Sequence, residues 1–411
     1  MRTLVYGGSF NPPHTGHVLS LSTAVRVLKP DRIRVIPTRI PPHKALPEGS
    51  PTAKDRLAMT ALAMSGVFGA MTSDTELRRE GKSYTVDTLA ELRRKDPGGE
   101  LYFLLGTDML LSLETWYQPR RIMELATIVL FARETDRRDE IESAVARLRR
   151  VYGAKIFILR GEPLEISSSE VREELAIRQG RELVPETVYS YIIQRRLYGA
   201  RPELAWLRDA AYAYLKPKRI PHVQGAEEEA VRLAERWGES VDDAAEAAIC
   251  HDITKKYPLE EQLRLCLSYG IQPDNYEAVS EKLLHAKTGA ELAGFLFGLS
   301  EPVKSAIRWH TTGRPGMSPL EKIMYLADYI EPGRSGFDGL AELRRAAYED
   351  LDLAMELGLR MSLLEVTGRG NRSHEHSIQA HEEALSALRE KGLSPARAEG
   401  IPDTVDGLDL T

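Results

Sequence analysis

The sequence predicts an α/β domain built on a doubly wound parallel sheet, followed by an all-helical domain. Over residues 1–198, short continuous apolar runs alternate with helical patterns, as is typical of parallel strands covered on both faces. Beyond residue 201, apolar residues recur only at helical spacing. The length of 411 residues allows two or three domains, each with its own core.

The expected strands are five apolar runs in the first domain, and the Pro/Gly-rich end of the chain is expected to be a flexible tail. We therefore divide the chain into residues 1–198, 199–393 and 394–411. The runs are 3–6, 32–37, 101–106, 127–132 and 155–159.

The segment Gly7-Gly8-Ser9-Phe10-Asn11-Pro12-Pro13-His14-Thr15-Gly16-His17 directly follows the first strand. Its glycines let backbone N–H groups approach an anion, and the helix that begins near Thr15 adds partial positive charge. His14 and His17 are three residues apart, so both imidazoles can face the same phosphate oxygens. A tight turn with two surface histidines is the plainer alternative. The spacing of the histidines at a strand end favours a phosphate site.

Polar motifs follow the other strands, at the sheet edge where ligands of doubly wound sheets bind. Lys44 can supply a mobile positive charge, although a solvated loop lysine is the alternative. Ser167 and Ser168 open a helix with Arg172 one turn in, which suits a triphosphate. Ser83 or Thr85 could instead simply cap a helix. The motifs are Pro41-Pro42-His43-Lys44, Ser83-Tyr84-Thr85, Gly106-Thr107-Asp108, Trp116-Tyr117 and Ile166-Ser167-Ser168-Ser169-Glu170-Val171-Arg172.

These motifs resemble those of a known family. His14-Thr15-Gly16-His17 resembles the signature of the nucleotidyltransferase superfamily, and the segment from Gly7 resembles that of bacterial nicotinate-nucleotide adenylyltransferases, with Asn11 where Asp is usual. The resemblance spans residues 1–198 and implies a Rossmann-like fold that transfers the adenylyl group of ATP, with Mg²⁺ on the nucleotide, to nicotinate mononucleotide. Pyrophosphate and deamido-NAD are the products.

The resemblance also implies roles for individual residues. His14, His17, Lys44 and Arg172 are the expected catalytic residues, and Lys44, Tyr84, Thr85 and Trp116 are expected to bind the nicotinate nucleotide. The residues expected to bind ATP are Gly7, Gly8, Ser9, Phe10, His14, His17, Gly106, Asp108, Ile166, Ser167, Ser168 and Arg172. Pantetheine phosphate and nicotinamide mononucleotide remain competing acceptors.

The second domain distributes histidines over separate predicted helices. His251 and Asp252 are adjacent, about 100° apart on a helix, so both can face one interior site. Imidazole and carboxylate ligands from several helices suit iron, manganese or zinc. The set is His222, His251, Asp252, His285, His310 and Asp328. The helices are expected at 209–215, 225–237, 242–250, 259–267, 278–285, 290–297, 302–309, 320–330 and 340–363.

This set is similar to that of the HD phosphohydrolase superfamily, and the surrounding stretches resemble its YqeK-like branch from about residue 219 to 364. The resemblance implies symmetrical hydrolysis of diadenosine tetraphosphate to two ADP, by water activated at two metals. His222, His251, Asp252 and Asp328 would hold one metal, and Asp252 would bridge to a second metal held by His285 and His310. Iron is expected first, and the same ligands accept Mn, Co or Zn.

Lys255 and Arg308 are expected to hold the polyphosphate, Lys255 within the catalytic set together with Asp252 and Arg308 as a substrate contact; a solvated charge is the alternative for Lys255 and for Arg308. His374, His376 and His381 are interpreted as a solvated helix start. Two alternatives stay open for this half. It could hydrolyse a dNTP or a guanosine alarmone, or it could be a non-catalytic nucleotide-sensing module.

Composition limits the partners. A net charge of −6 argues against a general nucleic-acid binder, and no apolar run is long enough to cross a membrane. With only two cysteines and no signal segment, a reducing cytoplasm is expected. The expected partners are small nucleotides (ATP, nicotinate mononucleotide and diadenosine tetraphosphate), and homo-oligomerisation is left open.

Overall fold

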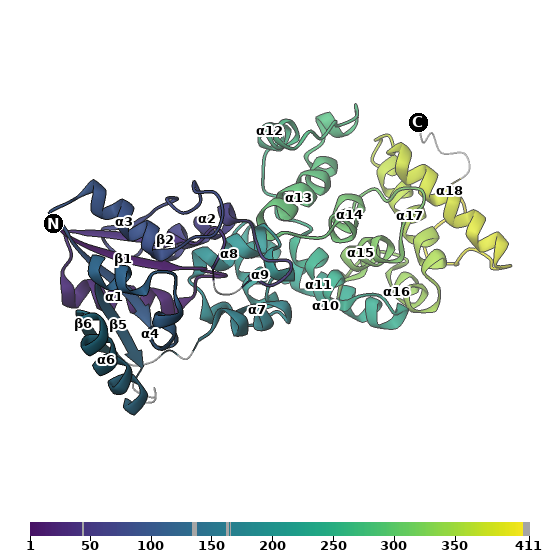
Figure 1. Cartoon of the computed structure of the whole chain (residues 1–411). Coiled ribbons are helices and arrows are strands. Elements are labelled where there is room, and N and C mark those ends of the chain that lie inside the picture. Colours follow the sequence, from purple (N-terminus) through teal and green to yellow (C-terminus); the bar gives the residue numbers. More distant parts are fainter. Residues whose placement is uncertain (43–44, 134–137, 162–163, 165, 406–411) are drawn as a thin grey trace. The chain divides into compact units, whose positions relative to one another are not determined.

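The computed structural model describes residues 1–42, 45–133, 138–161, 164 and 166–405. The chain divides into two compact units, Met1–Arg201 and Pro202–Thr411. The division lies close to the boundary expected after residue 198. Figure 1 shows the strands of the first unit and the helices of the second.

The first unit is built on a six-stranded sheet in the order β3-β2-β1-β4-β5-β6, in which every neighbouring pair is parallel. The predicted doubly wound parallel sheet is therefore confirmed. The strand order reverses between β1 and β4, because β2 and β3 extend from one side of β1 and β4 to β6 from the other. The strands are β1 (Arg2–Gly8), β2 (Arg32–Pro37), β3 (Ala70–Thr72), β4 (Glu100–Gly106), β5 (Thr127–Arg133) and β6 (Ile156–Gly161).

Helices cover both faces of this sheet (Figure 1). On one face, Val5, Phe103 and Leu130 pack with buried residues of α3 to α6 in a single apolar core. Alternate strand residues such as Leu4 and Val35 point to the opposite face and are fully buried. The helices are α1 (Thr15–Leu28), α2 (Ala53–Met64), α3 (Thr85–Lys95), α4 (Thr107–Ser112), α5 (Pro119–Leu125), α6 (Arg138–Tyr152), α7 (Ser168–Ala176) and α8 (Glu186–Gln194).

The described part of the second unit is helical, as predicted. Its buried side chains are mostly Ala, Leu, Ile and Met, which pack α10, α11, α14 and α15 around one interior. The helices are α9 (Leu204–Tyr212), α10 (Ile220–Trp237), α11 (Val241–Cys250), α12 (Leu259–Tyr269), α13 (Glu281–Phe297), α14 (Glu301–Trp309), α15 (Pro319–Ile330), α16 (Leu340–Glu349), α17 (Leu351–Gly368) and α18 (Glu375–Glu390).

Two predicted helix boundaries were wrong. The helices expected at 278–285 and 290–297 form the single helix α13. The helix expected at 340–363 is two helices, because Asp350 interrupts it and accepts hydrogen bonds from the backbone N–H groups of Asp352 and Leu353. An Asp in this position ends one helix and caps the next.

The segment expected to be a flexible tail from residue 394 makes defined contacts with α17. Arg360 is fully buried there, and its guanidinium donates hydrogen bonds to the backbone carbonyls of Ala396 and Pro402. These contacts involve Ala396 and Pro402 of the segment, and its flexibility stays a prediction. None of the helices in the described residues is both long and apolar enough to cross a bilayer.

Candidate functional sites

The loop between β1 and α1 brings its two histidines together. The rings of His14 and His17 lie 3.7 Å apart between centroids, and the His14 backbone N–H donates to Nδ1 of His17 at 3.2 Å. Burial, with the charge of His14, lowers the pKa of His17 well below its ordinary value. His17 is therefore a neutral imidazole whose proton resides on Nε2, ready to donate to an anion.

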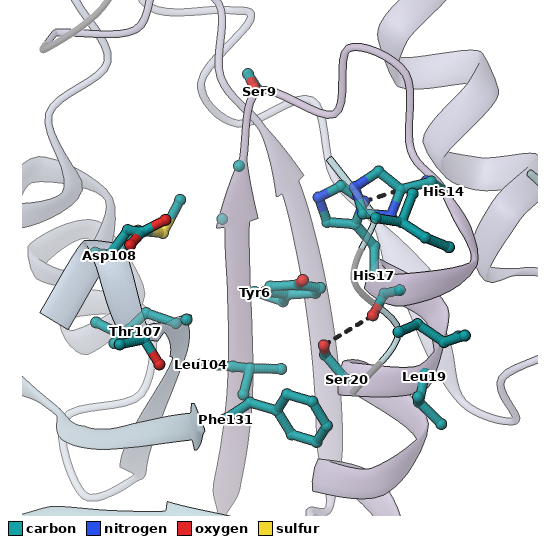
Figure 2. A pocket seen from close by; sticks show the side chains of 18 residues that line it. Tyr6, Ser9, His14, His17, Leu19, Ser20, Leu104, Thr107, Asp108 and Phe131 are labelled. Carbon is teal, nitrogen blue, oxygen red and sulfur yellow. Dashed lines mark hydrogen bonds between the residues drawn. The ribbon is translucent and has the colours of Figure 1, made fainter. Parts of the chain in front are cut away.

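The histidine pair lines a cavity of about 280 Å³ above the carboxyl ends of β1 and β4. Of the residues expected to bind ATP, the cavity wall includes Gly7, Gly8, Ser9, His14, His17, Gly106, Asp108 and Ile166. Figure 2 shows Asp108 on one side of the end of β1 and the histidine pair on the other side. The cavity thus has histidine donors and flexible glycine backbone along one wall and a carboxylate across from them.

A second cavity of about 380 Å³ lies beside the first, against α3. Thr85 and Trp116, both expected to bind the nicotinate nucleotide, line it, together with Ser83 and Phe103. Tyr84 does not line it in the described structure; its ring packs on Tyr117 at 4.6 Å. The wall is largely apolar with a few polar groups, as is common for a site that binds an aromatic ring.

The two cavities share one wall, formed by Gly7, Gly8, Ser9, Asp108 and Met109. This wall lies at the reversal of strand order between β1 and β4, where ligands of doubly wound sheets bind. Two ligands in these cavities would meet over the glycines at the end of β1. The arrangement therefore suits a transfer reaction between two bound substrates.

The serine–arginine motif at the start of α7 supports the loop between β1 and α1. Arg172 donates to the carbonyl of Asn11 at 2.7 Å, and the hydroxyl of Ser168 donates to the carbonyl of Pro12 at 2.9 Å. Ser167 caps α7, because its hydroxyl accepts the N–H of Glu170. In this structure the motif holds the loop that carries the histidines.

Phe10 and Lys44 are the remaining predicted site residues of this unit. Phe10 is buried against the ring of His17, at 5.1 Å between centroids, and so fixes the orientation of that imidazole. Lys44, together with His43, lies outside the described residues.

Arg56 and Glu76 are two functional candidates that the sequence analysis missed. Arg56 is 1% exposed and donates to the carbonyls of Ser9, Thr38 and Arg39, so it joins the loops after β1 and β2. Glu76 is buried in the wall of the second cavity, and burial raises its pKa. Helical spacing could have found Arg56, because it lies on the same stripe of α2 as Met59 and Ala63.

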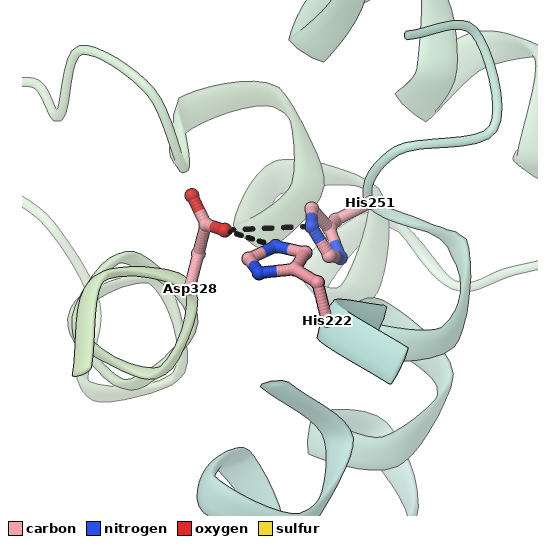
Figure 3. A group of neighbouring side chains, drawn as sticks. All are labelled: His222, His251 and Asp328. Carbon is pink, nitrogen blue, oxygen red and sulfur yellow. Dashed lines mark ion pairs between the residues drawn. The ribbon is translucent and has the colours of Figure 1, made fainter. Parts of the chain in front are cut away.

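In the second unit, all six predicted ligand residues come together. The ligand atoms of His222, His251 and Asp328 lie within 4.8 Å of one another (Figure 3). Those of His251, Asp252 and His310 lie equally close together. His285 joins the cluster, with its Nε2 at 3.2 Å from both Oδ1 of Asp252 and Nε2 of His310.

His251 and Asp252 lie in the turn just after α11, not within a helix as expected. Both side chains are fully buried. The two oxygens of Asp252 face different neighbours: Oδ2 lies 3.4 Å from Nε2 of His251, and Oδ1 lies 3.2 Å from Nε2 of His285. Asp252 therefore lies between the two halves of the cluster, where a bridging ligand belongs.

Three of the four rings are oriented by their own backbone. Nδ1 of His251, His285 and His310 each donates to the carbonyl three residues earlier, at 2.7, 2.7 and 2.6 Å. Because a carbonyl can only accept, each of these rings holds a proton on Nδ1, and its Nε2, which carries the lone pair of the neutral ring, points into the cluster. Burial lowers the pKa of His251, but Asp252 and Asp328 outweigh it and raise that pKa. Inward-facing lone pairs are what a metal requires.

The charges of the cluster also fit a metal centre. Burial opposes ionisation of Asp252 and Asp328, but the neighbouring histidines hold the pKa of both carboxyls well below the ordinary value. Burial lowers the pKa of His310 and His285, which keeps both rings neutral. Nε2 of His222 and His251 and Oδ1 of Asp252 and Asp328 are buried without a well-directed hydrogen bond. Such orphaned ligand atoms, converging from α10, α15 and the turn after α11, fit bound divalent cations.

Cationic side chains contact both halves of this cluster. Nζ of Lys255 lies 3.1 Å from Nε2 of His285. Arg219, which the sequence analysis missed, pairs with Asp252 at 2.5 Å. Arg308 is not brought to the cluster by any described contact; its guanidinium pairs with Glu291 at 2.6 Å and Glu301 at 3.0 Å.

The interpretation of His374, His376 and His381 as a solvated helix start was wrong. His374 is buried, caps α18 and pairs with Asp274 at 2.7 Å. His381 is buried beside Glu356, and His376 packs edge-on against Trp309. The prediction relied on the charged residues next to these histidines in the sequence and overlooked the buried face of α18, which includes Ala380, Ala384 and Leu388.

Comparisons with known proteins divide the chain in the same way. Residues 5–174 match the cytidylyltransferase-like family, and residues 219–333 match the HD domain. A probable nicotinate-nucleotide adenylyltransferase of Lachnoclostridium phytofermentans is 38% identical, over 47% of this chain and 97% of that protein.

Two further proteins extend the comparison. A probable nicotinate-nucleotide adenylyltransferase/Ap4A hydrolase of Mycoplasma pneumoniae is 28% identical, over 87% of this chain and 98% of that protein. A crystal structure from Clostridium acetobutylicum, described as a predicted HD superfamily hydrolase involved in NAD metabolism, is 38% identical over 46% of this chain and all of its own, with a TM-score of 0.44.

Proposed function

We propose that this chain, which belongs to the nicotinate-nucleotide adenylyltransferase family through its first unit, is a bifunctional enzyme. The first unit adenylylates nicotinate mononucleotide, and the second hydrolyses diadenosine tetraphosphate (Ap4A) to two ADP. One observation carries this proposal: a protein named for both activities aligns over 87% of the chain, across both units. The paired cavities and the buried histidine–aspartate cluster supply matching chemistry.

In the first unit, we assign the 280 Å³ cavity to ATP and the 380 Å³ cavity to nicotinate mononucleotide. The mononucleotide phosphate oxygen attacks the α-phosphorus of ATP, a new P–O bond forms, and pyrophosphate leaves. His17, with its proton on Nε2, donates to the phosphate oxygens as charge develops there, and His14 stands beside it. Mg²⁺ arrives with ATP, and Lys44 remains a proposed triphosphate ligand.

The choice of nicotinate mononucleotide as the acceptor rests on Trp116 and Thr85, which line the second cavity. Trp116 offers an aromatic face to the pyridine ring, and a hydroxyl at the start of α3 can bind its carboxylate. The test is to supply the full-length chain with ATP and each of three acceptors: nicotinate mononucleotide, nicotinamide mononucleotide and pantetheine phosphate. We expect the highest kcat/KM for nicotinate mononucleotide; a preference for either other acceptor would refute the assignment.

In the second unit, we assign two divalent metals to the cluster, with iron first among the candidates and Mn, Co or Zn acceptable to the same ligands. His222, His251, Asp252 and Asp328 would hold one, and Asp252, His285 and His310 the other. Bound metals supply Lewis-acid charge and lower the pKa of water. Lys255 and Arg219 lie at the cluster edge, where they can bind and orient a polyphosphate.

Product identity tests this second assignment. Symmetrical hydrolysis of Ap4A yields two ADP, whereas asymmetrical cleavage yields ATP and AMP. We expect two ADP from the full-length chain and none from His251→Ala. Release of triphosphate from a dNTP, or of pyrophosphate from a guanosine alarmone, would indicate a different hydrolase. Absence of turnover together with absence of bound metal would favour a nucleotide-sensing module.

A further inference from the structure

One of the four cluster histidines is oriented differently from the others. Nδ1 of His251, His285 and His310 donates to a backbone carbonyl, but Nδ1 of His222 lies 3.1 Å from a carboxylate oxygen, Oε1 of Glu331. A carboxylate can only accept, so His222 donates its Nδ1 proton to it and directs Nε2 at Asp328, 2.7 Å away.

Glu331 is held in this position from several sides. It directly follows α15 and is 3% exposed, and its Oε2 accepts a hydrogen bond from the backbone N–H of Gly333. A Cβ added at Gly225 would lie 2.5 Å from Oε2, and one added at Gly333 would lie 2.9 Å from it. The two glycines therefore leave the space that the carboxylate occupies, and the one at 225 lies one turn after His222 on the same helix.

Cationic side chains lie near both proposed metal positions. Beside the His222 position, the guanidinium groups of Arg219 and Arg334 lie 3.8 and 3.6 Å from Oδ1 of Asp328, so they offset the charge of the carboxylates there. Beside the other position, the ammonium group of Lys255 lies 3.1 Å from Nε2 of His285. The two positions therefore differ chiefly in what holds the histidine rings: a carboxylate holds His222, and backbone carbonyls hold the rings of the second position.

We propose that Glu331 is a positioning residue that makes the His222 position the tighter of two metal sites. A carboxylate that accepts the Nδ1 proton fixes the ring and raises the basicity of Nε2, which strengthens the bond to a metal. Metal loading is therefore sequential: the His222 position fills first, and the position beside Lys255 fills at higher metal concentration. This inference rests on the metal centre proposed above.

Titration of the metal-free full-length chain with Mn²⁺, followed by electron paramagnetic resonance, tests the proposal. We expect two equivalents of unequal affinity in the wild type. Glu331→Gln keeps the shape and an acceptor but removes the charge, so it should weaken the tighter equivalent about 10- to 100-fold and leave the weaker one unchanged. Glu229→Gln is the matched control. Glu229 is a buried glutamate on α10 whose carboxylate accepts a hydrogen bond from the hydroxyl of Tyr348, and its substitution should change the affinity of neither Mn²⁺ equivalent.

Each outcome has a defined meaning. Unchanged Mn²⁺ binding in Glu331→Gln would overturn the inference, as would an equal weakening of both equivalents. Loss of folding in Glu331→Gln but not in the control would overturn it in favour of a purely structural role. Gly225→Ala provides an independent route, because the added methyl group displaces the carboxylate, and it should weaken the same equivalent. If the wild type binds no Mn²⁺, the proposed metal centre itself fails.

Discussion

Arg56 connects the loop after β1, which lines both substrate cavities, to the loop after β2, which lines the second, so its replacement should affect both stability and substrate binding. Its guanidinium donates to the carbonyls of Ser9 and Thr38 at 2.8 and 2.7 Å, and to that of Arg39 at 3.1 Å. Arg56→Met removes all three donors but keeps most of the aliphatic packing. The carbonyls then lose their partners in a place where little water reaches them.

The magnitude follows from those three carbonyls. Each unsatisfied buried acceptor costs about 1–3 kcal/mol, and water that enters the vacated space recovers part of this cost. We therefore expect Arg56→Met to lower the free energy of unfolding by about 3–5 kcal/mol. Arg56→Lys keeps the charge, but one ammonium group cannot reach carbonyls on both loops equally well, so its effect should be intermediate.

Urea unfolding and hydrogen–deuterium exchange check this prediction. Peptides covering residues 6–13 and 36–41 should exchange faster in Arg56→Met, and the KM of both substrates should rise, because Ser9 lines both cavities. Arg78→Met is the control, since the Arg78 side chain is 65% exposed and forms an i,i+4 surface pair with Asp74. A loss below about 1 kcal/mol with unchanged exchange would refute the role given to Arg56.

Three further predictions concern the two sites. Trp116→Ala should raise the KM for nicotinate mononucleotide about tenfold, as expected for about 1.4 kcal/mol of aromatic contact, and should change the KM for ATP little; steady-state kinetics with each substrate varied would show this. The pKa of His17 is lowered in the folded protein, so below about pH 6.5 the unfolded chain takes up a proton on His17 that the folded protein does not. The free energy of unfolding should therefore fall as the pH drops below that value, by at most about 1.4 kcal/mol per pH unit for this residue. In His17→Gln, the free energy of unfolding measured at a series of pH values should fall less steeply with acid than in the wild type. An unchanged slope would contradict the conclusion that the His17 ring is neutral in the folded protein. Chelation should lower the thermal stability of the second unit, because the histidine and carboxylate ligands then lose the metal ions that join them and Arg219 is left as a partial substitute between Asp252 and Asp328; Mn²⁺ at about 100 times its Kd should restore about 2.7 kcal/mol, which calorimetry can measure.

Most of the first unit could be predicted because buried parallel strands are continuous apolar runs. All five expected runs are strands, whereas β3 was missed because its three residues carry no such run. The motifs converged because the carboxyl ends of parallel strands meet at one edge. The support given by Arg172 and Ser168 to the loop carbonyls could not be predicted, because those contacts join residues more than 150 positions apart.

In the second unit, the six ligand residues could be named from their types and spacing, and the structure brings them together. Arg219 and Glu331 were missed because their sequence neighbours look like ordinary loop and helix-end residues. Their roles become visible only when α10, α15 and the turn after α11 come together. Arg308 shows the reverse case. It lies two residues before the ligand His310 in the sequence, but its guanidinium pairs with Glu291.

The central claim, that one chain carries two separate active sites, is tested most directly by measuring both reactions in the wild type, His17→Ala and His251→Ala. We predict that His17→Ala loses deamido-NAD synthesis but still converts Ap4A to two ADP, and that His251→Ala shows the reverse. Loss of both activities in either variant, with the fold intact by circular dichroism, would contradict the assignment of the two reactions to separate sites.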